Sequence, residues 1–284
     1  MNPTTHSRIL KDFILRCLKE DIGDGDHSSL ASIPYEAGGK ARLLVKEKGI
    51  LSGCDIAEEV FRIVDKDLKF EKFISDGSRI SPGDIVFHVS GRVHSILKSE
   101  RLVLNIMQRM SGIATSTRMY VERIKGLKAK VLDTRKTTPG MRFLEKEAVR
   151  TGGGLNHRMG LYDMIMLKDN HLDYAGGIEN AVRKTREYLT HTSKKLKVEI
   201  EARNLDDVRK ILEIGGVDRI MLDNFNINDT REAVKLIGNR CETESSGGIT
   251  LDSIRTYAEC GVDYISAGAL TNHIKSLDMS LKAF

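Results

Sequence analysis

A repeated pattern over the second half of the chain places the strongest limit on its fold. Short apolar runs end in a polar residue or a glycine, and each is followed by a segment with helical periodicity. The last five runs end 33, 22, 23 and 22 residues apart, at Lys168, Glu201, Asp223, Ser246 and Gly268. A spacing near 22 residues accommodates one strand and one helix. The pattern therefore predicts successive βα units and a parallel sheet, beginning with the run at residues 131–133.

The first third of the chain predicts a different, mixed arrangement. Apolar residues on one face predict a helix over residues 7–20, and a shorter helix is expected at 57–64. Strand-like runs separated by glycine and proline turns occupy residues 41–47, 68–74 and 85–89. A long helix from residue 99 to about 125 leads into the repeated pattern. A length of 284 residues suits two domains, or one barrel with an appendage.

Composition excludes several classes of protein. Hydrophobic residues make up 40% and charged residues 30%, with 4 prolines, so a folded protein is expected. No run approaches the roughly 18 apolar residues of a membrane span, and no secretory signal opens the chain. The 4 cysteines lack metal-ligand spacing. We therefore expect a reduced, cytoplasmic protein without structural zinc or membrane association.

Polar residues at the strand ends suggest an active site. In βα barrels the functional groups lie where strands pass into loops at the carboxyl face. Lys168, Glu201 and Asp223 occupy such positions and bring basic and acidic groups to one mouth. The last two strands end in the loops Ser246-Gly247-Gly248 and Ala267-Gly268-Ala269. Glycine lets backbone N–H groups approach a phosphate, and a helix expected near residue 250 would add a favourable dipole.

The segment from residue 133 to residue 171 is the most basic part of the chain. Three of its charged residues fit a solvated helical face: Arg142, Lys146 and Glu147. Such a face does not account for Arg135 and Lys136 at a strand end, nor for His157 and Arg158 after a glycine triplet. The planar fork of arginine matches carboxylate and phosphate oxygens, so the cluster predicts a ligand with several negative charges.

Glu201 and Asp223 form an acidic counterpart on neighbouring strands. Their oxygens are ligands of the kind that Mg²⁺ takes when it is shared with substrate phosphates. Neither nucleotide-binding fingerprint of the P-loop or dinucleotide type occurs in the chain.

Several motifs together resemble one family. They are Thr134–Gly140 (TRKTTPG), Gly152–Arg158 (GGGLNHR), Leu167–His171 (LKDNH), Met221–Asn224 (MLDN), Glu242–Gly248, Ser266–Thr271 and the early Glu20–Asp26. In this order they resemble the quinolinate phosphoribosyltransferases, also called carboxylating nicotinate-nucleotide pyrophosphorylases. The likeness covers nearly the whole chain.

The resemblance implies an α/β fold in two parts. An N-terminal α/β sandwich domain (residues 1–112) would be followed by an incomplete α/β barrel of fewer than eight strands (residues 113–271). The tail at about 272–284 is expected to pack back on the first domain. The implied reaction joins quinolinate and phosphoribosyl pyrophosphate and yields nicotinate mononucleotide, pyrophosphate and CO₂, on the de novo route to NAD. Mg²⁺ would be needed, but no organic cofactor.

The resemblance also implies roles for individual residues. Those that would hold the two carboxylates of quinolinate are Arg135, His157, Arg158 and Lys168, with Thr134 and Lys136 in the same pocket. Glu201 and Asp223 would face the ribose and Mg²⁺, and together with Lys136 they are the expected catalytic residues. The two glycine-rich loops would cradle the 5′-phosphate. The enzyme is expected to be a homodimer, or a larger assembly of it, in which Arg101 enters the partner's pocket.

Three alternatives remain open. A paralogue associated with molybdate-transport operons would share the fold, although the intact basic cluster disfavours it. A phosphoribosyltransferase that uses nicotinate would share the chemistry. A non-enzymatic anion- or nucleic-acid-binding protein would fit the net charge of +5, but aromatic residues make up 5% and tryptophan is absent, which leaves little for base stacking. Release of CO₂ from quinolinate distinguishes the alternatives.

Overall fold

The computed structural model describes the backbone of residues 3–284 and the side chains from Ser7 onward. The chain divides into two compact units, one up to Ser116 that also contains residues 274–284, and one formed by residues 117–273. All four cysteines are free thiols. Within the described residues, no helix combines the length and the apolarity that a bilayer crossing requires.

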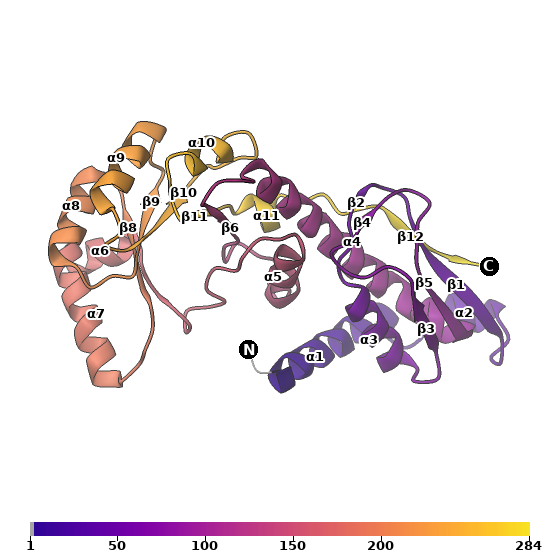
Figure 1. Ribbon diagram of the computed structural model, residues 1–284. Helices are drawn as coiled ribbons and strands as arrows, with labels where there is room; N and C mark the ends of the chain where they lie inside the picture. Colours follow the sequence, from indigo (N-terminus) through magenta and orange to yellow (C-terminus); the bar gives the residue numbers. More distant parts are fainter. Residues whose placement is uncertain (1–2) are drawn as a thin grey trace. The chain divides into compact units, whose positions relative to one another are not determined.

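The first unit is built on a four-stranded antiparallel sheet in the order β12-β1-β5-β3, and β2 pairs with β4 in a second, two-stranded sheet (Figure 1). The strands are β1 (Gly38–Val45), β2 (Gly49–Ile50), β3 (Lys69–Lys72), β4 (Arg79–Ile80), β5 (Ile85–Arg92) and β12 (Met279–Ala283). The helices are α1 (Pro3–Ile22), α2 (His27–Ser32), α3 (Cys54–Val64) and α4 (Val93–Arg123), and the boundary between the units falls within α4.

Alternating burial explains how this sheet forms. Ala41, Leu43 and Val45 of β1 are buried, whereas the residues between them are partly exposed. The rings of Phe61 on α3, Phe70 on β3 and Phe87 on β5 lie 4.5 to 5.9 Å apart, centroid to centroid, and join the helix to the sheet.

The C-terminal tail packs on the first unit. Strand β12 runs antiparallel to β1, with Ala283 opposite Ala41 and Met279 opposite Val45 (Figure 1). The short α2 and the strands β2, β4 and β12 have no counterpart among the sequence predictions, because pieces of two to six residues carry little periodicity.

The second unit contains a six-stranded parallel sheet in the order β6-β11-β10-β9-β8-β7. Its strands are β6 (Lys130–Leu132), β7 (Ile165–Leu167), β8 (Val198–Ala202), β9 (Arg219–Asp223), β10 (Glu242–Ser246) and β11 (Tyr264–Ser266). A parallel bridge from Leu132 to Leu155 extends the sheet beyond β6. The prediction of successive βα units is confirmed, and the described strands number fewer than eight.

Helices follow the strands in turn. They are α5 (Arg142–Thr151), α6 (Asp169–Ala175), α7 (Ile178–Thr192), α8 (Leu205–Ile214), α9 (Ile227–Ile237), α10 (Ile254–Ala258) and α11 (Ala269–Asn272). Figure 1 shows α7, α8 and α9 side by side along one side of β8 and β9. The side chains of Asn204 and Asn226 cap α8 and α9 by accepting hydrogen bonds from Asp207 and Asp229 N–H, each at 2.9 Å. The helices of two consecutive βα units thus both begin with an asparagine N-cap.

The helix expected near Thr250 is α10, which starts at Ile254 after a turn in which Thr250 and Ser253 hydrogen-bond and Ile254 N–H donates to the Thr250 carbonyl at 3.0 Å. One local prediction is wrong. Arg142, Lys146 and Glu147 do not form a solvated face, because α5 is enclosed on most sides and buries residues at six of its ten positions. Lys146 is fully buried and pairs with Asp133.

Candidate active site at the carboxyl ends of the strands

A cavity of about 710 Å³ opens at the carboxyl ends of the parallel strands. All sequence-predicted site residues of the second unit line it: Thr134, Arg135, Lys136, His157, Arg158, Lys168, Glu201, Asp223, Ser246, Gly247, Gly248, Ala267, Gly268 and Ala269. Arg101 belongs to the first unit, where it is exposed on α4. The fold thus brings together residues that are up to 135 positions apart in the chain (134 to 269).

Arg135 and Arg158 form the basic wall of this cavity. The Nε of Arg135 is buried and has no hydrogen-bond partner within the described part of the chain. The guanidinium of Arg158 donates to the carbonyl of Met164 at 3.3 Å and forms no ion pair with the described residues. Burial and then the nearby charge of Arg135 lower the pKa of Arg158. Two guanidinium groups therefore repel each other at a place where an anion would satisfy both.

His157 lies deeper, between this wall and the barrel interior. Its Nδ1 lies 2.7 Å from the backbone nitrogen of Arg158, whose N–H it accepts when the imidazole is neutral and carries its proton on Nε2. Nε2 lies 3.0 Å from Glu199 Oε2 and 3.5 Å from Glu244 Oε2. Burial would lower the pKa of His157, but hydrogen bonding to these two carboxylates raises it to about 9. Nε2 thus faces two carboxylates and Nδ1 faces the backbone of Arg158, so both ring nitrogens lie against protein groups.

The residues around His157 form a charged column inside the barrel. Arg219 Nη1 lies 2.9 Å from Glu244 Oε2 and 3.9 Å from Glu199 Oε2. Burial and the charge of Glu244 raise the pKa of Glu199 to about 7. His157, Glu199 and Glu244 place ligand atoms within 4.8 Å of one another, in the range of a metal site. Arg219 and His157 lie against both carboxylates, so the cluster has cationic partners without a metal ion.

Lys168, Glu201 and Asp223 form the opposite, mixed wall. Lys168 Nζ pairs with Glu201, which also accepts the backbone N–H of Asp169 at 3.2 Å. Asp223 is half-buried and accepts a hydrogen bond from Asn224 Nδ2 at 2.9 Å. Burial and the negative charge of Glu201 raise the pKa of Asp223. Two carboxylates that repel each other at the cavity wall are suited to stabilise a positive charge placed between them.

The two glycine-rich loops close the remaining side. Gly247 has a φ of +91°, and a Cβ there would lie 2.8 Å from the backbone N of Asn224. A Cβ on Gly268 would lie 2.9 Å from Lys136 Cδ. Only glycine permits the approach at Gly247, whereas at Gly268 the neighbour is the flexible side chain of Lys136. Lys136 therefore extends against the Gly268 loop, which brings an exposed ammonium group toward the expected phosphate cradle.

The structure adds residues that the sequence analysis did not single out. Glu199, Arg219 and Glu244 support His157 from within the strands, and Asp133, Lys146 and Asn156 support it from the other side. The sequence contains a pattern from which Glu199 and Glu244 could have been predicted to lie near the site. Glu199 lies two residues before Glu201, and Glu244 lies two residues before Ser246, so the members of each pair share one strand face.

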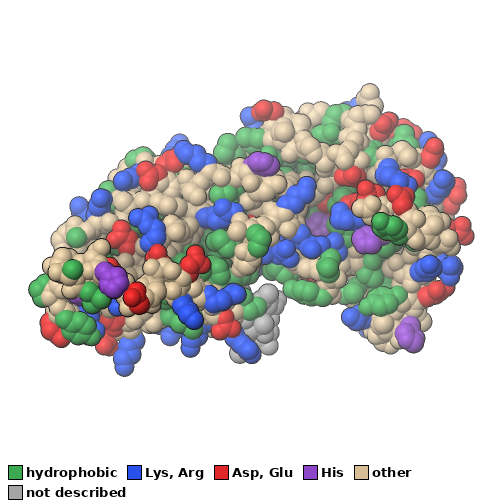
Figure 2. All heavy atoms as spheres, turned by 180° about the vertical axis from the view of Figure 1, so that it is seen from behind, with side chains coloured by type: hydrophobic (Ala, Val, Ile, Leu, Met, Phe, Trp, Pro, Cys, Tyr) green, Lys and Arg blue, Asp and Glu red, His purple; other side chains and the backbone are tan. Residues whose placement is uncertain are grey.

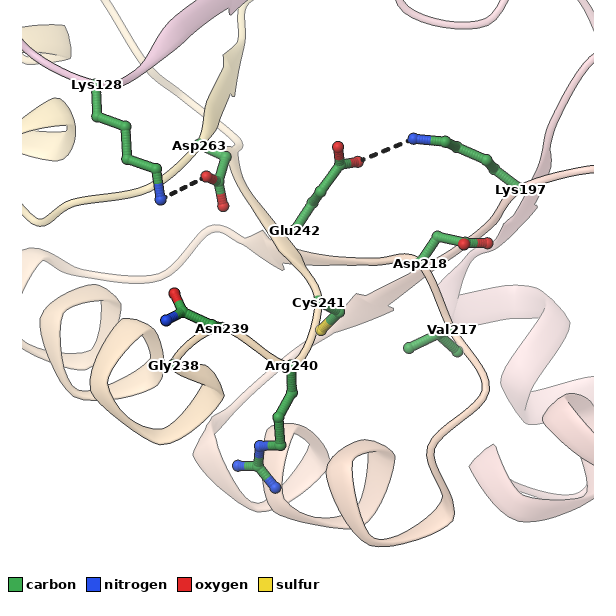
Figure 3. Close-up of a pocket in the computed structure, with 10 residues that line it drawn as sticks. All are labelled: Lys128, Lys197, Val217, Asp218, Gly238, Asn239, Arg240, Cys241, Glu242 and Asp263. Carbon is green, nitrogen blue, oxygen red and sulfur yellow. Dashed lines mark ion pairs between the residues drawn. The ribbon is translucent and has the colours of Figure 1, made fainter.

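A second cavity, of about 420 Å³, lies at the amino ends of the same strands (Figure 3). Four of its charged groups form two ion pairs: Lys128 lies 2.6 Å from Asp263, and Lys197 lies 3.6 Å from Glu242. No sequence-predicted site residue lines it. Since βα barrels carry their functional groups at the carboxyl face, we place the candidate active site in the first cavity.

Comparison with known proteins identifies the family of the chain. A family model described as quinolinate phosphoribosyl transferase, C-terminal domain, matches residues 113–282, and its N-terminal counterpart matches residues 26–111. A protein of Nicotiana tabacum named quinolinate phosphoribosyltransferase (decarboxylating) 1b is 44% identical over 288 residues, which cover 96% of this chain and 82% of the relative. A Bacillus subtilis protein named probable nicotinate-nucleotide pyrophosphorylase (carboxylating) is 41% identical over 281 residues, covering 99% and 94%.

Solved structures give the same result for the fold. NadC from Streptococcus pyogenes superimposes with a TM-score of 0.91 at 38% sequence identity. The match covers 100% of this chain and 99% of that one.

Proposed function

The chain belongs to the quinolinate phosphoribosyltransferase family, and we propose that the carboxyl-end cavity is its active site. The enzyme is a carboxylating nicotinate-nucleotide pyrophosphorylase, a pentosyltransferase of NAD biosynthesis. It transfers the phosphoribosyl group of phosphoribosyl pyrophosphate to the ring nitrogen of quinolinate. The products are nicotinate mononucleotide, pyrophosphate and CO₂.

One observation carries the assignment of the site. Arg135 and Arg158 lie close enough to repel each other, yet neither has an acidic partner among the described residues. A ligand with two carboxylates supplies the missing negative charge, since each carboxylate accepts paired hydrogen bonds from a guanidinium. Lys168 at the same mouth adds a third cation.

The acidic wall is suited to the transfer step. Departure of pyrophosphate leaves a ribose with oxocarbenium character, and the carboxylates of Glu201 and Asp223 stabilise that positive charge. The pyridine nitrogen then bonds to the sugar and becomes cationic. The adjacent carboxylate leaves as CO₂, its bonding electrons pass to the ring carbon beside the cationic nitrogen, and that carbon takes up a proton. No organic cofactor is required for this sequence.

We propose that Mg²⁺ enters with the pyrophosphate group and is held by Glu201 and Asp223, directly or through water. The fit is supported by the raised pKa of Asp223, which reflects burial and repulsion from Glu201 that a cation would relieve. Bound there, the ion would neutralise charge on the leaving pyrophosphate. The 5′-phosphate is assigned to the backbone N–H groups of the loops at Gly247 and Gly268, with Lys136 beside the second loop.

Asp223→Asn is expected to lower kcat by roughly 100-fold, because it removes negative charge where positive charge develops. The KM for quinolinate is expected to change less than about twofold, since the basic wall is untouched. Steady-state kinetics of CO₂ release measure both quantities. Asp252→Asn, at a carboxylate that is 94% exposed in the same unit, is the control. A large rise in KM for quinolinate at unchanged kcat would contradict this role for Asp223.

We further propose a homodimer, or an assembly built from it, in which Arg101 of each chain enters the pocket of its partner. Support comes from the exposure of Arg101 on α4 and from the lack of an acidic partner for it among the described residues. A C2 dimer makes two equivalent sites of this kind.

A nucleic-acid-binding function is disfavoured by the surface. Figure 2 shows acidic and basic side chains interspersed at both ends of the face that it presents, without a continuous basic stripe there. The test of the proposed function is release of CO₂ from carboxyl-labelled quinolinate that depends on phosphoribosyl pyrophosphate. A protein that only binds anions, or a paralogue with another acceptor, releases none.

A further inference from the structure

The buried pair Asp133–Lys146 has no place in the reaction described above, yet it lies directly behind the basic wall. Both side chains are 0% exposed. Burial raises the pKa of Asp133 to about 6 and lowers the pKa of Lys146, which reflects the desolvation cost of placing two charges inside the protein. An apolar pair at these two positions would avoid the desolvation cost, so the presence of two charges indicates that they have a role.

The pair holds one short segment of the chain, residues 155–158. Asp133 Oδ1 accepts the backbone N–H of His157 at 2.9 Å, and Lys146 Nζ donates to the backbone carbonyl of His157 at 3.0 Å. The amide nitrogen of Asn156, in the orientation that satisfies its hydrogen bonds, donates to Asp133 Oδ2 at 2.7 Å and to the Lys146 carbonyl at 2.8 Å. The carboxylate of Asp133 thus satisfies the backbone N–H of His157, and the ammonium group of Lys146 satisfies its carbonyl.

Backbone hydrogen bonds complete the attachment to β6. Leu155 N–H donates to the Val131 carbonyl at 2.8 Å, and Asp133 N–H donates to the Leu155 carbonyl at 3.1 Å. The segment is therefore fixed to the end of β6 by both backbone and side-chain contacts.

The two arginines of the basic wall lie next to the two segments that this contact joins, the end of β6 and residues 155–158. Arg135 follows Asp133 by two residues, and Arg158 follows directly after His157. Their charges repel each other, so without a constraint the two guanidinium groups would separate when the site is empty. A site that is held ready in the free enzyme does not spend binding energy on bringing the cations together.

We propose that Asp133, Lys146 and Asn156 are positioning residues that hold Arg135 and Arg158 at the separation required by a ligand with two adjacent carboxylates. The inference deepens the proposed function and rests on it, because it concerns how the same site recognises its acceptor. These residues touch no substrate and act through the position of the two arginines.

The test uses the double variant Asp133→Asn/Lys146→Met in the full-length enzyme. The variant keeps the approximate shape of both side chains, removes both charges together and so avoids leaving one buried charge unpaired. The KM for quinolinate is expected to rise roughly 10- to 100-fold, since displacement of a binding group by about 1 Å has effects of this size. The KM for phosphoribosyl pyrophosphate is expected to stay within about twofold, because the loops at Gly247 and Gly268 follow β10 and β11, and of the groups proposed to contact this substrate only Lys136 follows β6.

The matched control is Lys128→Met/Asp263→Asn, which removes an ion pair at the amino ends of the strands (Figure 3). It is expected to leave both KM values unchanged. A double variant of the buried pair that folds and keeps the wild-type KM for quinolinate overturns the proposal. An equal loss for both substrates also overturns it, since that result indicates a general structural role.

If the double variant does not fold, Asn156→Ala carries the test, because it leaves the ion pair in place. A rise in KM for quinolinate of about fivefold or more, with the KM for phosphoribosyl pyrophosphate unchanged, supports the proposal, and an unchanged KM for quinolinate overturns it. Wild-type activity is measured in parallel. An inactive wild type rejects the proposed function itself. An active wild type whose variants keep the same KM for quinolinate rejects only the positioning role.

Discussion

Arg135→Ala is expected to reduce kcat/KM for quinolinate by roughly 100-fold or more. The buried Nε of this guanidinium has no protein partner among the described residues, so it is available to a substrate carboxylate, and truncating one member of a desolvated charge pair costs about 2–5 kcal/mol. The fold is expected to persist, because Arg135 is partly exposed and lies beyond the end of β6. Initial rates of CO₂ release, with thermal unfolding measured alongside, check both expectations.

Arg203→Ala is the matched control for this variant. Arg203 follows β8 at the same edge of the sheet, but it is paired with Asp173 and Asp207 and does not line the cavity. Its loss is expected to change kcat/KM by less than about twofold. Near-normal activity of Arg135→Ala would show that the basic wall has been wrongly assigned.

Mixing two inactive variants is expected to restore activity, provided that Arg101 acts across a dimer interface. Arg101→Ala and Lys168→Ala each remove a cation of the proposed quinolinate pocket, and each variant alone is expected to be inactive. In a mixed dimer, one site takes Lys168 from the first chain and Arg101 from the second, both intact, while the other site lacks both. Random pairing makes half of the dimers mixed with one good site of two, so about a quarter of wild-type activity returns.

The experiment requires unfolding the two variants together, reassembling them and quantifying the mixed dimers by native mass spectrometry. Wild-type enzyme taken through the same cycle controls for losses during refolding. Absence of recovery in a sample that contains mixed dimers would mean that each chain completes its own site.

Much of the second unit could be predicted from the sequence. Parallel strands buried on both faces appear as short continuous apolar runs, and the predicted ends of β7 to β11 lie within two residues of the observed ones. Because those ends meet at one edge of the sheet, the residues found there could also be predicted to share a pocket, as Lys168, Glu201 and Asp223 do.

The supports of the site escaped prediction for a physical reason. Helical periodicity separates a buried face from a solvated one, but α5 is enclosed on most sides, so its pattern does not reveal that Lys146 is buried. The roles of Glu199 and Glu244 could not be predicted either, because a charge inside a buried strand needs a partner that the local sequence does not identify. Their partners, His157 and Arg219, come from distant parts of the chain.

The most direct test of the central claim compares quinolinate with nicotinate as acceptor under matched concentrations of phosphoribosyl pyrophosphate and Mg²⁺. A pocket with Arg135, Arg158 and Lys168 suits two carboxylates, and an acceptor with one leaves positive charge of the basic wall unpaired, at a cost of several kcal/mol. We expect nicotinate mononucleotide and CO₂ in equal amounts from quinolinate, and a rate with nicotinate lower by roughly 1,000-fold or more. Comparable turnover of nicotinate, or formation of the nucleotide from quinolinate without CO₂, would contradict the account.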